Sequence, residues 1–406
     1  MAYGSWVRMP AIARDLSGRA AIVGLGETDY GIDYAAARAK APGYEGHTSE
    51  SLTILAFERA LADSGLTRAD IDGISVSYLY GGPTPQETAD LLGIAPRHLD
   101  TGGGIMVGTI PMACAAIAEG KADTIALIYA AATRSIGRKF GGQVHKQDAA
   151  PASYYYYHPW GFSSQAAHWA MIWQRYMAHF GVDEADLASI AIQMRNNAMQ
   201  TDHAIMTKPL TVEDYLASRY VTKPLHLYDL CLVNDGGVCL ILQRADKARD
   251  RPHRPVTVSG WGESYVTQDK LEALVMQRLR PQFQQAGDQA LAMAGLSIGD
   301  IGHVECYDAA TIHLVNHLEG HGFVAEGEAL DFCQRGDMAI GGKLPVNTAG
   351  GMLSGSYMHG WNHVAEIVRQ LRHEAGARQI EGLHASLFSL AQTDQVHPLI
   401  FTQGDA

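Results

Sequence analysis

The residues best suited to chemistry lie in one crowded stretch near the C-terminal end of the sequence. This stretch, residues 341–363, reads GGKLPVNTAGGMLSGSYMHGWNH and places two glycine pairs among polar side chains. Glycine lets a backbone pass close to a ligand and adopt positive φ angles. Asn347, Tyr357 and His359 add groups that donate or accept hydrogen bonds and protons. We therefore expect a substrate site here, although Gly, Pro and Asn also build tight connections without chemistry.

The elements that must position this stretch alternate between buried strands and amphipathic helices. Short apolar runs ended by glycine predict strands, and apolar residues three and four apart predict helices. The expected strands are residues 20–26, 74–80 and 124–130, and the expected helices are residues 49–64, 110–119, 164–180, 185–199, 210–219 and 362–373. Residues 230–242 read as strand, turn and strand around Asn234, Asp235, Gly236 and Gly237. The alternation predicts an α/β fold with a mostly parallel sheet.

Two parts of the sequence repeat each other, which predicts a duplicated fold. Residues 260–264 (GWGES) echo 24–28 (GLGET), and residues 290–304 match residues 60–74 at seven positions without a gap. We expect a tail at 1–18, a first half at 19–250 with an insertion at about 135–225, and a second half at 255–400. The glycine turn at 102–104 should then face Gly350 and Gly351 at the carboxyl ends of strands, where α/β sheets bind ligands.

Composition limits the classes of function. The chain has 406 residues, 47% of them hydrophobic, and a formal net charge of −12, with no Lys/Arg-rich run that would mark a nucleic-acid or anionic-membrane surface. Five cysteines without a CxxC pair predict a reducing compartment, no disulfide framework and no zinc site. The sequence shows neither a secretory signal nor 18 consecutive apolar residues. We expect a soluble, cytoplasmic α/β enzyme without a membrane span.

Four segments together resemble the thiolase superfamily, and more narrowly its lipid-transfer or sterol-carrier-protein-x type. They are AIVGLGET at the start, TVEDYLASRYVTKPLHLYDLCLVNDGG in the middle, VECYDAAT at 304–311, and the glycine-rich stretch already described with the helix after it. The resemblance covers nearly the whole chain. It implies a thiolase fold layered α-β-α-β-α, a homodimer, and a coenzyme A thioester as substrate with no other cofactor.

The sequence departs from a true thiolase at the nucleophile. The family's acylated Cys falls at about Gly103, within TGGGIMVG, and glycine cannot be acylated. Cys114 comes later, inside an expected helix, and reads as a small core residue. The family's other catalytic positions fall on Tyr307, followed by Asp308, and on Tyr357, with His359 nearby.

Tyrosines at both positions resemble the steroid side-chain aldolases of the superfamily. That resemblance implies retro-aldol cleavage of a β-hydroxyacyl-CoA and a small zinc-ribbon/OB-fold partner subunit. Such a cleavage needs a base for the β-hydroxyl and donors for the developing enolate, but no acyl-enzyme. A phenol with an ordinary pKa of about 10 can donate without any shift, whereas a phenol acting as base needs a lowered pKa.

This chemistry assigns Tyr307 as enolate donor and Tyr357 as base or acid, with His359 as the alternative base and Asp308 as a further catalytic candidate. The resemblance places the substrate and its CoA moiety along the two glycine loops, at Gly103, Gly104, Asn347, Gly350 and Gly351.

Several alternatives remain open at the level of the sequence. Both tyrosines are also compatible with core packing, and Asp308 with a helix cap. His359 and His363 have metal-ligand spacing, but without a third ligand nearby we expect no metal. The chemistry also allows thiolase-type acyl transfer (retro-Claisen cleavage) with an unorthodox nucleophile, or a non-catalytic acyl-CoA-binding subunit.

The acyl group is equally open. Aromatic residues between 154 and 173 would suit a bulky ring system such as a sterol, a dimer contact or a helical core: Tyr154 to Tyr157, Trp160, Phe162, Trp169 and Trp173.

Overall fold

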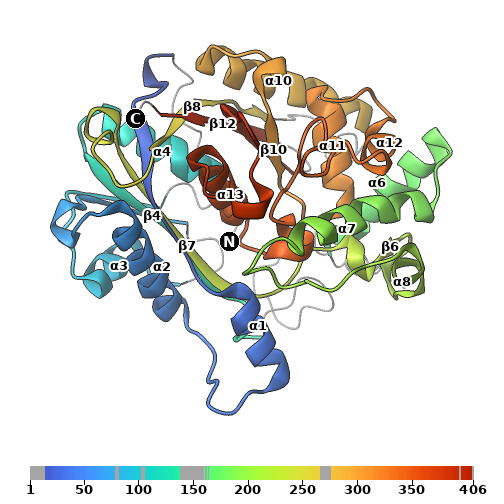
Figure 1. Cartoon of the computed structure of the whole chain (residues 1–406), viewed down its shortest axis with the longest axis horizontal. Helices are drawn as coiled ribbons and strands as arrows, with labels where there is room; N and C mark the ends of the chain where they lie inside the picture. Colours follow the sequence, from blue (N-terminus) through green and yellow to red (C-terminus); the bar gives the residue numbers. More distant parts are fainter. Residues whose placement is uncertain are drawn as a thin grey trace.

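One strongly bent sheet runs through the whole molecule (Figure 1). The computed structural model describes residues 14–77, 82–101, 106–137, 160, 162, 164–265, 276–392 and 395–404. Within this part, the sheet has the strand order β10-β11-β12-β8-β1-β7-β4-β2-β3, with β9 paired to β12. Its strands are β1 (Ala20–Glu27), β2 (Gly73–Val76), β3 (His98–Asp100), β4 (Thr124–Ala132), β7 (Asp235–Arg244), β8 (Val256–Trp261), β9 (Ser264–Tyr265), β10 (His303–Cys306), β11 (Ala385–Gln392) and β12 (Gln395–Gln403).

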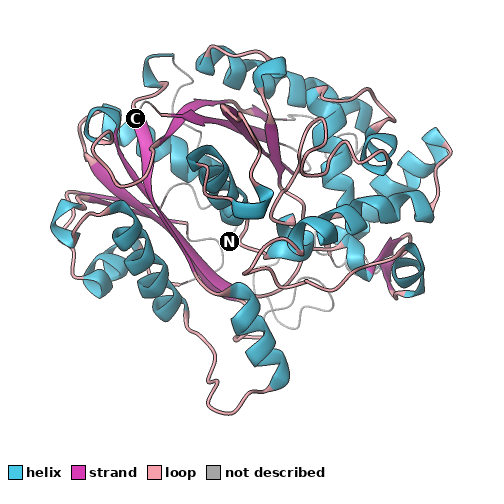
Figure 2. Ribbon diagram, viewed as in Figure 1, coloured by secondary structure: helices cyan, strands magenta, loops and turns pink. Residues whose placement is uncertain are grey.

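Helices cover both outer faces of the bent sheet and fill its inner side (Figure 2). On the outside, α2 and α3 pack on the first-half strands, and α10 and α11 pack on the second-half strands. Between the two halves lie α4 and α13, each of which contacts strands from both halves. The described helices are α1 (Tyr30–Ala39), α2 (Ser49–Ser64), α3 (Pro85–Leu92), α4 (Met106–Ala118), α6 (Gln165–Phe180), α7 (Glu184–Ala198), α8 (Val212–Ala217), α10 (Met276–Ala294), α11 (Thr311–His321), α12 (Ala329–Gln334) and α13 (Trp361–Arg372).

The strand pairing is symmetric about the β1–β8 contact. On one side β1 pairs antiparallel with β7, β7 antiparallel with β4, and β4 parallel with β2. On the other side β8 pairs antiparallel with β12, β12 antiparallel with β11, and β11 parallel with β10. The predicted mostly parallel sheet is therefore wrong, because apolar runs reveal that a strand is buried on both faces but not its direction. The half boundaries at 19–250 and 255–400 stay predictions.

The repeated glycine motifs have a common packing role. A Cβ added at Gly26 would lie 2.1 Å from the carbonyl oxygen of Ala56 in α2. At the equivalent Gly262, a Cβ would lie 1.9 Å from the carbonyl oxygen of Ala286 in α10. In each half, the glycines let an outer helix pack directly on the strand backbone.

The strand, turn and strand predicted for residues 230–242 is wrong. Residues 235–244 form a single strand, β7, which starts at Asp235 and contains Gly236 and Gly237. Both glycines are required by close packing, since a Cβ at Gly236 would meet Met358 Sδ at 2.6 Å and one at Gly237 would meet the Leu52 carbonyl oxygen at 2.8 Å. Gly236 and Gly237 resemble a turn in sequence, but in the structure they let neighbouring residues pack closely against the β7 backbone.

Some expectations fall outside the described residues. These include Tyr154 to Tyr157 and the glycine turn at 102–104, so the predicted facing of the two glycine loops is not described. A short hairpin of β5 (Tyr220–Thr222) and β6 (Leu225–His226) lies apart from the main sheet. Among the described helices, none combines the length and the apolar character that crossing a bilayer requires.

Candidate active site

The two tyrosines singled out by the sequence meet inside the protein. Tyr307 directly follows β10, and Tyr357 lies between a π-helical turn (Gly351–Gly355) and α13. Their hydroxyl oxygens are 3.5 Å apart, and each side chain is only 5% exposed. Two phenols from segments 50 residues apart in the sequence thus form one polar pair within the largest cluster of buried hydrophobic residues that the structure describes.

His359 completes this group. Its ring lies edge-on to Tyr307, with centroids 5.6 Å apart, and 6.2 Å from the ring of Tyr357. It has a positive φ of 52° in the loop that leads into α13. Burial lowers the pKa of His359 to about 4, so the imidazole is neutral near pH 7 and able to accept a hydrogen bond.

Backbone anchors fix both tyrosines. The Tyr307 N–H donates to the carbonyl oxygen of Ser389 in β11 at 2.9 Å. The Tyr357 N–H donates to Asn234 Oδ1 at 2.8 Å, and Asn234 itself is 1% exposed. Asn234 therefore ties the first half of the chain to the loop that carries Tyr357. The sequence marked Asn234 only as part of a turn, and this contact was missed.

Asp308 does not cap the helix that follows it, which corrects one interpretation of the sequence. The helix α11 has Ala310 at its N-cap position, without a side-chain cap. The Asp308 carboxylate instead accepts the N–H groups of Met352 at 2.8 Å and Leu353 at 3.4 Å. Asp308 therefore holds the start of the turn that leads to Tyr357.

The glycine loop around Asn347 is shaped by the same carboxylate. A Cβ at Gly351 would lie 2.1 Å from Asp308 Oδ2, and a Cβ at Gly350 would lie 2.5 Å from Ala198 Cβ in α7. The Asn347 amide pairs with the backbone of Cys306, accepting from its N–H at 2.6 Å and donating to its carbonyl at 3.0 Å. These contacts give Asn347, Gly350 and Gly351 a structural role. Their binding of substrate stays a prediction. Gly103 and Gly104 lie outside the described residues.

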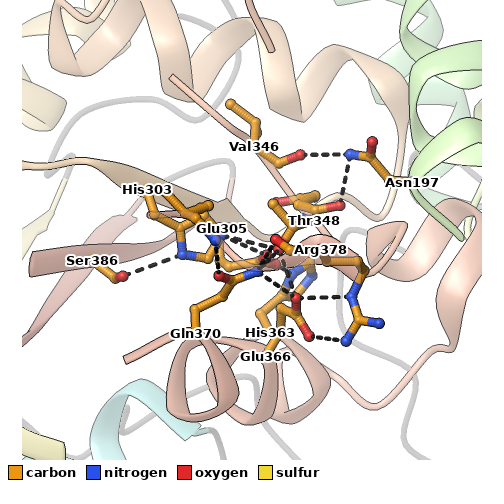
Figure 3. Close-up of polar contacts among 12 residues, drawn as sticks. Asn197, His303, Glu305, Val346, Thr348, His363, Glu366, Gln370, Arg378 and Ser386 are labelled. Carbon is orange, nitrogen blue, oxygen red and sulfur yellow. Dashed lines mark hydrogen bonds and ion pairs between the residues drawn. The ribbon is translucent and has the colours of Figure 1, made fainter. Parts of the chain in front are cut away.

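The sequence did not reveal a buried polar network that includes Glu305, His363 and Thr348 (Figure 3). His363, considered above only as a metal ligand, lies between Glu305 Oε2 at 2.5 Å and Asp308 Oδ1 at 3.1 Å. From Glu305 the network continues to Thr348, whose N–H donates to Glu305 Oε1 at 2.9 Å, and then to Glu366 at 2.8 Å. In the part of the chain that the structure describes, no three His, Cys, Asp or Glu side chains are grouped to hold a metal ion.

The electrostatics of this network follow from burial and charge pairing. Burial opposes the charged form of His363, but hydrogen bonds from its ring to Asp308 and Glu305 outweigh burial and raise its pKa to about 9. For Asp308, burial raises the pKa despite the bond to His363. For Glu305, burial acts in the same direction, but the bonds from His303 and His363 prevail and lower the pKa.

Cys114 is packed as a core residue, as the sequence predicts. It lies in α4 with 1% exposure, and burial raises the pKa of its thiol to about 12. A thiol with so high a pKa is a poor nucleophile at neutral pH.

Two aromatic residues differ in their relation to the tyrosine pair. Trp173 is fully buried and donates from Nε1 to Thr311 Oγ1 at 3.1 Å, which makes it part of the core. Trp169 is only partly buried and lies edge-on to His313, with centroids 4.9 Å apart. The ring of His313 is in turn 6.3 Å from that of Tyr307. Ring contacts thus link Trp169 to the candidate site through His313.

Comparisons with known proteins agree with this architecture. The family model described as "Thiolase C-terminal domain-like" matches residues 270–392. A "Steroid side-chain-cleaving aldolase" from Thermomonospora curvata is 33% identical over 88% of this chain and 91% of its own length. A "17-hydroxy-3-oxo-4-pregnene-20-carboxyl-CoA lyase" from Mycobacterium tuberculosis is 34% identical over 88% of this chain and 92% of its own.

A solved structure described as "Ltp2-ChsH2(DUF35) aldolase" has a TM-score of 0.82 and 31% identity, covering 96% of this chain and 99% of that one. The predicted thiolase fold is thereby confirmed. Together, the similarity over most of the chain and the shared fold show that the protein belongs to the thiolase-fold family that includes the steroid side-chain-cleaving aldolases.

Proposed function

We propose that this protein is a lyase that cleaves a carbon–carbon bond of a β-hydroxyacyl-CoA by a retro-aldol reaction. The observation that carries the proposal is the buried Tyr307–Tyr357 hydroxyl pair beside the neutral His359. Family members named as an aldolase and as a lyase of a steroid carboxyl-CoA support the same reaction class.

The reaction assigns one proton-transfer role to each group. A base, Tyr357 or His359, takes the proton of the β-hydroxyl, and the oxygen electrons form a carbonyl as the Cα–Cβ bond breaks. The electron pair of that bond moves into the thioester as an enolate, whose oxygen accepts a hydrogen bond from Tyr307. Protonation of the α-carbon then yields a shorter acyl-CoA and a free ketone or aldehyde. No acyl-enzyme forms at any step.

His359 is a neutral group beside the two phenols. With its pKa lowered to about 4, the imidazole is a hydrogen-bond acceptor near pH 7 and a weaker base than an ordinary histidine. Tyr307 as donor needs no pKa shift. The assignment of Tyr357 or His359 as the base depends on which group reaches the β-hydroxyl of bound substrate.

A bulky, ring-containing acyl group fits the aromatic surroundings. Trp169 contacts His313, whose ring lies near that of Tyr307, and it packs against two clusters of the hydrophobic core. A steroid-type side chain is consistent with the substrate that the name of the M. tuberculosis relative states.

We also propose a small partner subunit of the zinc-ribbon/OB-fold type. The similar solved structure is described as a complex of two named components. Co-expression with such a partner should raise the yield or the turnover of the chain. Full turnover of the chain alone, with unchanged affinity for the CoA ester, would oppose this part of the proposal.

Product analysis together with intact-protein mass spectrometry tests the reaction class. Incubation with a β-hydroxyacyl-CoA should release a carbonyl compound and a shorter acyl-CoA in equal amounts, while the protein mass stays unchanged. A covalent acyl adduct on the chain would show acyl transfer instead. Tight CoA-ester binding without any product, even with the partner present, would indicate a binding subunit.

A further inference from the structure

A buried carboxylate, that of Asp308, links the two tyrosine segments. Asp308 follows Tyr307 in the chain and accepts the N–H groups of Met352 and Leu353, at the start of the turn that leads to Tyr357. A shift of this carboxylate therefore moves both phenols relative to each other. Because Asp308 is 0% exposed, water cannot replace a lost partner cheaply.

The partner of Asp308 is His363. Among the residues that the structure describes, it is the one basic side chain that reaches Asp308, with Nε2 at 3.1 Å from Oδ1. Its other nitrogen, Nδ1, lies 2.5 Å from Glu305 Oε2. A ring nitrogen that faces an ionised carboxylate must donate, and two such contacts require a proton on both nitrogens. The geometry therefore calls for an imidazolium between two carboxylates.

The other polar and aromatic groups around His363 bond to or pack against residues other than Asp308. The second oxygen of Glu305 faces His303 at 3.1 Å and the Thr348 N–H, and Thr348 bonds to Glu366 on the same helix as His363. Glu366 is neutralised by Arg378, with contacts of 3.1 and 2.9 Å. From β11, the ring of Phe388 packs 5.7 Å from that of His363, and His317 of α11 lies close enough to interact with it electrostatically. None of these groups offers Asp308 a substitute cation.

We propose that His363, as a buried imidazolium held between Glu305 and Asp308, is the positioning residue that sets the geometry of the Tyr307–Tyr357 pair. It does not touch substrate and acts through Asp308 and the Met352–Leu353 backbone. This inference deepens the proposed lyase function and rests on it for its catalytic consequence. The raised pKa of about 9 agrees with a cation that persists through the neutral range.

The variant His363→Gln removes the charge and leaves a side chain that can serve only one carboxylate as donor. The matched control is His397→Gln, another buried histidine, which lies in β12 and bonds to Gln395 at 2.8 Å. For cleavage of a β-hydroxyacyl-CoA by the chain with its partner, we expect kcat of His363→Gln to fall by about 30-fold or more at pH 7.5. KM should change by less than about 3-fold, and His397→Gln should keep both constants near those of the unaltered protein.

The pH profile separates this role from a general packing defect. In the unaltered protein, kcat should decline as pH rises through about 9, because His363 loses the proton that holds both carboxylates. His363→Gln should lack that decline between pH 8 and 9.5. A normal kcat and an unchanged profile in this variant would overturn the proposal.

Two measurements without substrate keep the inference separate from the proposed reaction. In protein labelled with ¹⁵N at histidine, one ring should show the shifts of an imidazolium at pH 8, and that signal should disappear in His363→Gln. Hydrogen exchange of the segment with Met352 and Leu353 should quicken in His363→Gln but not in His397→Gln. Both results could be obtained while the unaltered protein cleaves no β-hydroxyacyl-CoA. In that case the proposed retro-aldol reaction is wrong, and the proposed positioning role of His363 holds. An absent imidazolium signal or unaltered exchange contradicts the positioning itself.

Discussion

At the scale of the residue, Cys114 offers the most direct test for acyl-transfer chemistry. The Cys114 thiol is buried in α4, and burial raises its pKa to about 12. We expect Cys114→Ala to keep turnover within about 2-fold and to lower the free energy of unfolding by about 1 kcal/mol, as loss of one small buried group does. Steady-state rates and urea unfolding check the two parts. A 100-fold loss of rate in a folded variant would make Cys114 the nucleophile.

The sequence located the tyrosine pair but not its support. Tyr307 and Tyr357 stand at motif positions that carry polar catalytic groups, so their residue type alone was informative. The partnership of Asp308 with His363 joins residues 55 apart in the chain, and it exists only because α13 packs against β10. No local spacing encodes such a contact. For the same reason, the alternative interpretation of Asp308 as a helix cap is wrong, while its predicted catalytic role stays a prediction.

At the scale of the element, sequence patterns predicted which segments form strands and helices more reliably than how they pair. The helix expected at 49–64 is α2, Ser49–Ser64, where the Thr48 side chain caps the first turn and Gly65 ends the helix in a left-handed conformation. Strand direction was predicted incorrectly, because direction depends on the connections between elements. The glycines of β7 were read as a turn because a chain-local reading does not show the helix packed against them.

The duplicated glycines in and directly after strands β1 and β8, Gly26 and Gly262, allow a sharp test of helix–strand packing. In Gly262→Ala the new Cβ would lie 1.9 Å from the Ala286 carbonyl oxygen of α10, so α10 must move away from β8. We expect a loss of about 2–3 kcal/mol in the free energy of unfolding, measured in urea, as for overpacked cores.

A matched control for this test is Gly299→Ala. A Cβ at Gly299 meets only Ser297 Oγ, at 3.8 Å. This variant should change the unfolding free energy by less than about 0.5 kcal/mol. Equal stability of the two variants would contradict the packing role of the repeated glycines.

At the scale of the whole molecule, buried histidines make the fold sensitive to acid. Burial lowers the pKa of His313 and His397 to about 4 and that of His321 to about 3. A histidine whose pKa is lower in the folded state stabilises the fold above its unfolded pKa of about 6.5 and loses that contribution as pH falls below it. Asp229, whose pKa burial raises to about 6, and His363, whose pKa its two carboxylate partners raise to about 9, act in the opposite direction, but their combined effect is smaller than that of the three histidines.

We therefore expect stability to fall between pH 7.5 and 5.5, by about 1.4 kcal/mol for each of these histidines. Urea unfolding at the two pH values measures the change. In the variant His397→Gln, the decrease in the free energy of unfolding between the two pH values should be smaller by the contribution of that one histidine. A stability that rises on acidification would show that the histidines are not held neutral in the folded protein.

Assembly is a second property of the whole molecule. We predict a twofold-symmetric homodimer, the commonest closed assembly. The strand β4 (Thr124–Ala132) is separated from the edge of the described sheet by β2 and β3. The short edge strand β3 (His98–Asp100) leaves Leu99 38% exposed and is the better candidate for the contact. Light scattering that gives a monomer mass at micromolar concentration would contradict the prediction.

The measurement that tests the central claim most directly is the turnover of Tyr307→Phe and Tyr357→Phe with a β-hydroxyacyl-CoA. Each change removes one hydroxyl oxygen from the 3.5 Å pair and little volume. If the phenols hold the enolate and move the proton, each variant should lose about 100-fold or more in kcat, about 2.7 kcal/mol of transition-state stabilisation, at nearly unchanged KM. His359→Ala should lose less if Tyr357 is the base. Normal turnover in both Phe variants would contradict a reaction centred on the tyrosine pair, and normal turnover in Tyr357→Phe with none in His359→Ala would assign the base to the histidine.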